Sequence, residues 1–256
     1  MGTTISFGIQ KGGAGKTTTT AITAFLLAQS GKKVLAVDFD SQGNLTQFLT
    51  QRNIYDFTEQ TALEALKEQN AAPYIHPVST NLDILPAEDF LITFSSWLYQ
   101  KYPGTDPSRV LKDTLEPVKD RYDFILIDLP PNLGDHTING LTASDFAVVM
   151  LQSEPFCHDA LDRYLETLQA VKKKTNPDLI LAGILTVMLD ARTTLDTAIL
   201  DKARRDYEDV VFHSVIKRRS RIKEFTVTGL QLVTKADHDA LEPYNNFVKE
   251  LLERVK

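Results

Sequence analysis

The sequence predicts an α/β fold with a doubly wound, mostly parallel sheet flanked by helices. Uninterrupted apolar runs at 5–9, 34–37 and 124–127 are typical of parallel strands that are buried on both faces. Helical patterns lie between and after these runs, and such alternation favours a parallel sheet with crossover helices. The chain has 256 residues, 43% of them hydrophobic, which is enough for the core of a single domain covering 1–256.

Each of these predicted strands ends in a turn that carries polar or charged side chains. The first strand leads into the glycine-rich stretch KGGAGKTT (11–18), the second into Asp38 and Asp40, and the third into Asp128. Ligands of open parallel sheets bind at the carboxyl ends of the strands. The turns therefore predict a single site at one edge of the sheet. Because the first strand begins by residue 5, no N-terminal helix-turn-helix domain is expected.

Helices are predicted from periodic apolar patterns, whereas 70–122 is the least readable part of the chain and is expected to hold insertions. The predicted helices cover approximately 16–30, 59–69, 88–100, 155–174, 194–206 and 238–255. The last helix is amphipathic, and its apolar side chains are expected to pack on the sheet.

Composition and charge exclude several classes of protein. The single cysteine, Cys157, excludes an internal disulfide and a metal site built from several thiolates, and it favours a cytoplasmic location. No apolar segment is long enough to span a bilayer, and the most apolar one, 179–189, is typical of a buried strand. The net charge of −6 excludes a surface that is positive throughout, but it allows a local basic patch.

The glycine-rich stretch has the features of a phosphate-binding loop. It follows a predicted strand and opens a predicted helix, so that backbone N–H groups and the positive end of the helix can converge on an anion. Lys16 can reach the outer phosphates, and the Thr17 hydroxyl can hold a magnesium ion. The residues expected to contact the nucleotide are Gly12, Gly13, Ala14, Gly15, Lys16, Thr17 and Thr18.

Aspartates at the other strand ends provide the expected magnesium and water ligands. Asp128 suits a magnesium ion that keeps most of its waters and needs one or two carboxylates beside the phosphates. Asp38 and Asp40 stand two positions apart, so one can face the metal while the other faces the γ-phosphate and its attacking water. The loop departs from the common pattern at Gln10, where a glycine is usual, and adds a second lysine, Lys11.

The segments KGGAGKTTT, VLAVDFDSQGNLT and YDFILIDLPPNLG resemble the ParA/MinD group of deviant Walker ATPases, and partition proteins of the ParA type most closely. The resemblance extends through LQSEPF (151–156), MLDARTTL (188–195) and VFHSVIKRRSRIKEF (211–225). It implies a P-loop ATPase with ATP and Mg²⁺ as cofactors, and a homodimer that forms with ATP bound. The ATP is hydrolysed slowly until a ParB-like centromere-binding partner stimulates the reaction.

The resemblance also implies roles for individual residues. Lys11 reaches across the dimer interface to the partner subunit's phosphates and acts in catalysis with Lys16 and Asp40, of which Asp40 positions the water. Thr17, Asp38 and Asp128 help to bind the magnesium ion, and Thr18 helps to bind the phosphates. The residues alone also allow Lys11 to be an exposed charge of the loop.

A basic cluster, KRRSRIK (217–223), holds five basic residues in an otherwise acidic chain. It is either a solvated strand or loop face or a patch that binds the DNA backbone; the resemblance favours non-specific DNA binding. The expected DNA contacts are Arg192, Lys217, Arg218, Arg219, Arg221 and Lys223.

These observations predict a DNA-partition ATPase located in the cytoplasm and on the nucleoid, without stable membrane association. Two alternatives remain open: a membrane-associated spatial regulator like MinD, and a nucleotide-bound scaffold with negligible hydrolysis. The final helix lacks the basic and bulky apolar extension expected of a membrane-targeting tail.

Overall fold

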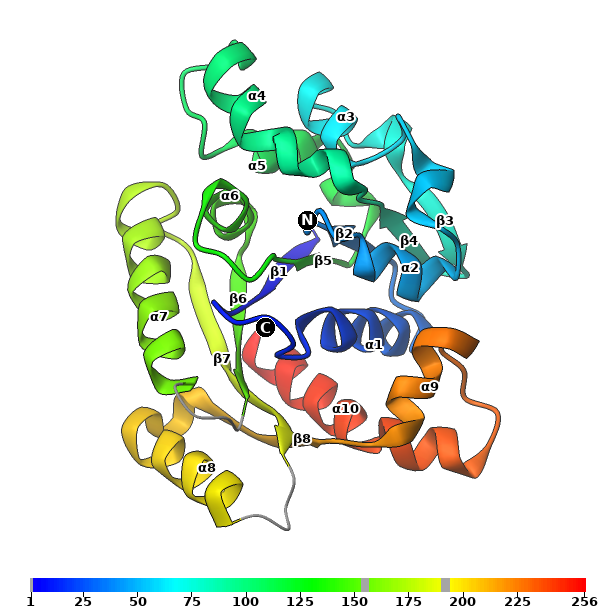
Figure 1. Cartoon of the computed structure of the whole chain (residues 1–256), viewed down its shortest axis with the longest axis vertical. Helices are drawn as coiled ribbons and strands as arrows, with labels where there is room; N and C mark the ends of the chain where they lie inside the picture. The colour runs from blue at the N-terminus through cyan, green and yellow to red at the C-terminus, as the bar shows by residue number, and fades with distance from the viewer. Residues whose placement is uncertain (1, 153–156, 190–193) are drawn as a thin grey trace.

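The computed structural model describes residues 2–152, 157–189 and 194–256, and these form a sheet covered by helices on both faces (Figure 1). The sheet has eight strands in the order β3-β4-β2-β5-β1-β6-β7-β8. All strand pairs are parallel except β3–β4, as the sequence predicts for a mostly parallel sheet. The strands are β1 Thr3–Gly8, β2 Val34–Asp38, β3 His76–Ser79, β4 Leu82–Leu85, β5 Phe124–Asp128, β6 Phe146–Gln152, β7 Ile180–Leu189 and β8 Val211–Lys217.

Helices α1 and α10 pack on one face of the sheet, and α6 and α7 cover the other (Figure 1). The helices are α1 Lys16–Gln29, α2 Asn44–Thr50, α3 Ala62–Glu68, α4 Phe94–Lys101, α5 Val110–Leu115, α6 Asp135–Ala143, α7 Cys157–Lys174, α8 Thr194–Tyr207, α9 Ser220–Thr228 and α10 Lys235–Arg254. The prediction for the last helix is confirmed, because Tyr244, Phe247, Val248 and Leu251 of α10 are buried.

The central strands bring the predicted turns together. β5 lies between β2 and β1, and all residues of β2 and β5 are buried, as expected for strands covered on both faces. The register pairs Asp38 with Asp128 across β2–β5, and Phe7 with Asp128 across β1–β5. The chain therefore leaves β1, β2 and β5 at the same edge of the sheet, where the phosphate loop begins.

The end of β1 is fixed by a close contact with α7. Gly8 has no room for a side chain, because a Cβ there would overlap the ring and hydroxyl of Tyr164, which is fully buried. Tyr164 thereby sets the position from which the phosphate loop departs.

Region 70–122, the least readable part of the sequence, contributes to the core of the fold, since β4 pairs with β2 inside the sheet and α5 packs against α6. The predicted helix at 88–100 is a 3₁₀ turn, Asp89–Thr93, followed by α4. The sequence did not predict α2, α5, α6 or α9, which have six to nine residues each and so show little periodicity.

Candidate nucleotide-binding site

The phosphate loop holds its glycines in conformations that other residues rarely adopt. Gly13 and Gly15 have φ angles of 73° and 71°. Gly15 precedes the first residue of α1 and provides no side-chain cap, so the N–H groups of the first helical turn remain open to an anion. Lys16 is buried, and its Nζ donates to the backbone carbonyl of Lys11 at 3.1 Å.

Thr17 and Asp128 form a pair suited to a hydrated magnesium ion. The Thr17 hydroxyl donates to Asp128 Oδ2 at 2.6 Å. Asp128 Oδ1 is buried and has no hydrogen-bond partner among the described residues, so it can accept a bond from a metal-bound water. Burial raises the pKa of the Asp128 carboxyl, and the nearby Asp38 raises it further. A cation bound beside Asp128 would lower the pKa of this carboxyl.

The other two aspartates are placed differently from each other. Asp38 is fully buried: its Oδ2 accepts from the N–H and hydroxyl of Thr46 at 2.8 Å and 2.7 Å, and its Oδ1 accepts from the N–H of Asp40 at 3.3 Å. Burial raises the pKa of Asp38 to about 7 despite these hydrogen bonds. Asp40 is half-buried and lines the cavity beside the loop.

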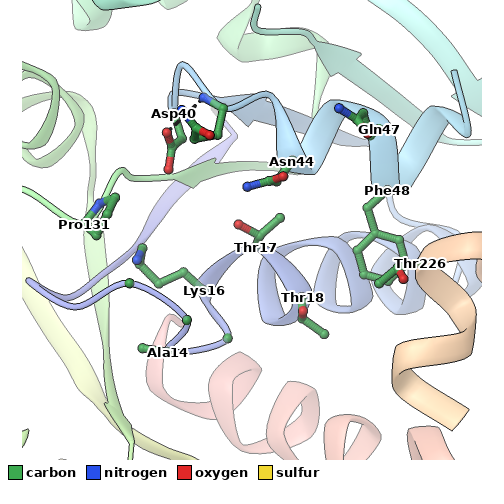
Figure 2. Close-up of a pocket in the computed structure, with 14 residues that line it drawn as sticks. Ala14, Lys16, Thr17, Thr18, Asp40, Asn44, Gln47, Phe48, Pro131 and Thr226 are labelled. Atoms are coloured by element: carbon green, nitrogen blue, oxygen red, sulfur yellow. Dashed lines mark hydrogen bonds between the residues drawn. The ribbon is translucent and has the colours of Figure 1, made fainter. Parts of the chain in front are cut away.

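A cavity of about 580 Å³ lies in front of the phosphate loop (Figure 2). Figure 2 shows Lys16 on the side of Asp40 and Pro131, whereas Phe48 and Thr226 close the opposite end. The predicted residues that line it are Gly12, Gly13, Ala14, Gly15, Lys16, Thr17, Thr18 and Asp40. Sequence reasoning missed the remaining lining residues, Gln42, Asn44, Gln47, Phe48, Pro131 and Thr226. The polar stretch that directly follows Asp40 was the available signal for Gln42 and Asn44.

A second cavity of about 300 Å³ adjoins the first and shares Gly15, Thr18 and Thr226 with it. One part of its wall is apolar and includes Val187, Ile216, Ile222 and Tyr244. Another part is formed by four residues of the basic cluster, Lys217, Arg218, Arg219 and Lys223. The basic cluster therefore lies next to the phosphate loop, which the sequence did not indicate.

The basic cluster spans the end of β8 and the first turn of α9, and its members differ. Lys217, Arg218, Arg219 and Lys223 are exposed and form no ion pair with a described residue. Arg221, in contrast, has a side chain that is 25% exposed and pairs with both Asp237 and Glu224. The remaining expected DNA contact, Arg192, lies outside the described residues.

Within 2–152, 157–189 and 194–256, no group of three or more His, Cys, Asp or Glu residues is placed to hold a metal ion. Among the described helices, none is long and apolar enough to cross a bilayer.

Comparison with known proteins confirms the family. Residues 2–181 match the AAA domain family. The chain is 36% identical over 241 residues to the sporulation initiation inhibitor protein Soj of Bacillus subtilis, covering 91% of each chain. It is 35% identical to the chromosome-partitioning ATPase Soj of Treponema pallidum, covering 99% of this chain and 98% of the relative.

A solved structure with bound nucleotide agrees with the fold. The crystal structure of cobyrinic acid a,c-diamide synthase from Mycobacterium smegmatis, with bound ADP and magnesium, is 30% identical and has a TM-score of 0.84. The likeness covers 99% of this chain and 95% of that one. The Soj relatives, which match almost end to end, and the geometry of the phosphate loop lead to the same conclusion: the chain belongs to the ParA/Soj family of P-loop ATPases.

Proposed function

We propose that this protein is a DNA-partition ATPase of the cytoplasm and nucleoid. It binds ATP and Mg²⁺, forms a homodimer around the nucleotide, and in this state binds DNA without sequence preference. Hydrolysis, stimulated by a ParB-like centromere-binding partner, resets the cycle. The observation that carries the proposal is the shared wall of the two cavities, which places the basic cluster next to the phosphate loop.

Substrate binding follows from the loop and the first turn of α1. Backbone N–H groups from Gly12 to Thr18 surround the phosphates, and Lys16 neutralises their charge from a buried position. The adjoining cavity, with its apolar residues Val187, Ile216 and Tyr244, suits the flat face of a purine base.

Thr17 and Asp128 would hold magnesium, through the hydroxyl and through a bound water respectively, and the ion supplies charge neutralisation at the phosphates. Asp38 would support this site indirectly, because both of its oxygens already accept hydrogen bonds from Thr46 and Asp40. The half-buried carboxylate of Asp40 faces the cavity, where it can orient the attacking water.

Lys11 serves the second subunit in this proposal. Its carbonyl is held by Lys16 Nζ, which fixes the loop backbone, and the lysine lies at the entrance of the phosphate loop. A cation from the partner subunit would make ATP a bridge between subunits, so that dimer formation depends on the γ-phosphate. Slow basal hydrolysis fits a site that lacks one positive charge until the ParB-like protein supplies it. In related chemistry, a positive charge supplied in this way raises the rate by about 10³ to 10⁵.

DNA binding would use the exposed cations Lys217, Arg218, Arg219 and Lys223, with Arg192 as a further candidate. If about three cations per subunit contact phosphates, a dimer makes about six contacts and its affinity falls with a log-log salt slope near −5; a monomer has about half this slope. ATP can thus control DNA binding through dimer formation alone.

The direct test is DNA co-sedimentation with ATP, with ADP and without nucleotide, each across a salt series. The proposal predicts retention with ATP only and a slope near −5, which Arg218→Glu/Arg219→Glu reduces. Equal retention in all three nucleotide states would contradict it. Parallel flotation with anionic liposomes separates this function from that of a MinD-like membrane regulator; no flotation is expected, because the sheet already covers the apolar face of α10.

Catalysis is tested with Asp40→Ala, which is expected to lose phosphate release while it retains ATP. A nucleotide-bound scaffold without hydrolysis would instead show the same negligible release in the wild type and in Asp40→Ala.

A further inference from the structure

A cluster of three rings begins one residue after the end of β2. Phe39, Phe94 and His136 come from the turn after β2, from α4 and from the first turn of α6. Their ring centroids lie 5.7 Å apart for Phe39 and Phe94, 5.3 Å for Phe39 and His136, and 5.1 Å for Phe94 and His136. The two phenylalanines have no exposed surface, whereas His136 is half-buried. We call these three residues the aromatic cluster.

The aromatic cluster is joined to the turn that carries Asp40. Phe39 stands between Asp38 and Asp40 in the sequence, and its N–H donates to the carbonyl of Asp128 at 3.1 Å. Its ring therefore anchors the first part of the turn in the core. On the other side, the N–H of Gln42 donates to Asp40 Oδ1 at 3.1 Å and so orients the carboxylate.

The first turn of α6, which contains His136, also holds the loop between β5 and α6. The Thr137 hydroxyl donates to the carbonyl of Asn132 in this loop at 2.5 Å. Pro131 of the same loop lines the phosphate cavity together with Asp40 (Figure 2). His136 thus contacts the Asp40 turn through its ring, while its own backbone belongs to the segment that holds the opposite loop.

The ring of His136 is itself fixed from the side of α4, which packs beside α6 (Figure 1). Its Nε2 lies 3.1 Å from the carbonyl oxygen of Leu91, in the 3₁₀ turn that leads into α4. Because a carbonyl oxygen only accepts, Nε2 carries the proton. Burial lowers the pKa of the His136 imidazole, so the ring is neutral at pH 7 and packs on the phenylalanines without a buried charge.

We propose that His136 is a positioning residue for ATP hydrolysis. By packing on Phe39, its ring fixes the turn that carries Asp40 relative to the loop that carries Pro131. His136 is not among the described residues that line the phosphate cavity, so it acts through its neighbours and not on the nucleotide. The inference rests on the proposed role of Asp40 in orienting the attacking water.

Such a role separates the rate of hydrolysis from nucleotide affinity. A group that orients a water must keep its geometry closely, and a displacement of about 1 Å can lower a rate about 100-fold. The phosphate loop, in contrast, holds the nucleotide from the segment between β1 and α1. Loss of the His136 ring should therefore slow the reaction and leave binding nearly unchanged.

Three substitutions separate the ring of His136 from its hydrogen bond. His136→Phe keeps an aromatic ring on Phe39 but loses the N–H that bonds to Leu91, His136→Gln keeps a donor but loses the ring, and His136→Ala loses both. Tyr99→Phe is the matched control. Tyr99 of α4 is 69% exposed and its hydroxyl donates to Asp135 Oδ1 at 2.7 Å, so the control removes another contact between α4 and the first turn of α6.

Phosphate release across an ATP series with Mg²⁺ gives kcat and KM, titration with fluorescent ADP gives affinity, and urea denaturation gives the unfolding midpoint. His136→Gln and His136→Ala are expected to lower kcat about tenfold, with KM and ADP affinity within about threefold of wild type. His136→Phe should keep kcat within about threefold, although its midpoint falls because the Leu91 carbonyl loses its donor. Tyr99→Phe should match the wild type in kcat.

A merely structural role predicts that kcat follows the unfolding midpoint, so that His136→Phe loses as much activity as His136→Gln. That result would overturn the proposal, as would equal losses of kcat and ADP affinity, or an unchanged kcat in both His136→Gln and His136→Ala. Asp40→Ala is measured in parallel. Hydrolysis that survives Asp40→Ala would contradict the proposed function itself, whereas its loss there, with full activity in His136→Ala, would contradict only the positioning role.

Discussion

At the scale of single residues, the phosphate loop holds two lysines in different surroundings. Lys16 is buried at the first position of α1 and is attracted by Asp128 and Asp40, although burial is the larger effect and lowers its pKa. Lys11 precedes two exposed glycines, and its backbone carbonyl accepts from Lys16 Nζ. The same charge at two positions can therefore serve two subunits.

This difference leads to a prediction for the two lysines. Lys16→Ala should weaken nucleotide binding by about 10- to 100-fold, because charged hydrogen bonds to phosphate are lost within the subunit. Lys11→Ala should leave ADP affinity within about threefold of wild type and abolish the ATP-dependent dimer. Titration with fluorescent ADP and analytical ultracentrifugation measure the two effects. An equal loss of ADP affinity in both variants would assign Lys11 to its own subunit's nucleotide.

The buried carboxyl of Asp38 predicts a dependence of stability on pH. Burial raises its pKa in the folded protein to about 7, from the ordinary value of 3.8. The folded state therefore retains a proton that the unfolded chain releases, and this contribution to stability is lost as pH rises towards 7. In the absence of nucleotide, the contribution of Asp38 to the unfolding free energy should fall between about pH 4 and pH 7 and level off above, as measured by urea denaturation.

Asp38→Asn removes the titrating group while it preserves the shape of the side chain. The variant should show a shallower decline over the same pH range and should exceed the wild type in stability at pH 8. Identical slopes in the two proteins would show that Asp38 does not titrate in this window.

At the scale of elements, the edge strand β8 depends on α10. Glu250 accepts from the backbone N–H groups of His213 and Ser214 at 2.8 Å and 3.0 Å. Arg254 donates to the carbonyls of Ala182, Val210 and Val211 at 3.1 to 3.2 Å, and its guanidinium lies over Phe212. These contacts occupy part of the edge that would otherwise be open to pairing with another chain.

Arg254→Ala should therefore destabilise the protein by about 2 to 4 kcal/mol, because it leaves three carbonyls without their donor and removes the cation that pairs with the Glu250 carboxylate. Lys249→Ala, at an exposed position of the same helix, is the control and should change stability by less than about 0.5 kcal/mol. Urea denaturation provides both values. A loss for Arg254→Ala as small as that of the control would mean that water replaces these contacts without cost.

The elements around the site differ in how well the sequence predicts them. The strands that position the site were predictable, because β2 and β5 are short and apolar except for the aspartate that ends each of them. Helix α9 was not, since its charged segment has little apolar periodicity and is held by Asp237, sixteen residues away from Arg221. The phosphate loop was found from local glycine spacing, whereas Thr226 and Phe48 enter the cavity only through tertiary packing.

At the scale of the whole molecule, the nucleotide cavity is proposed to face the second subunit. Asp40 and Gln42 line a cavity that is bounded by the phosphate loop, α2 and α9. A dimer closed over this cavity would exclude water from the phosphates and double the number of cations presented to DNA. Nucleotide binding, dimer formation and DNA binding would then depend on one another through the surface around this cavity.

Sedimentation velocity of Asp40→Ala with saturating ATP and Mg²⁺ tests this linkage most directly, because blocked hydrolysis keeps the nucleotide intact. The expected result is a species of twice the mass of the 28.7 kDa chain with ATP, and the monomer with ADP. A monomer under both conditions would contradict the account, since neither the role of Lys11 nor the control of DNA binding by ATP could then hold.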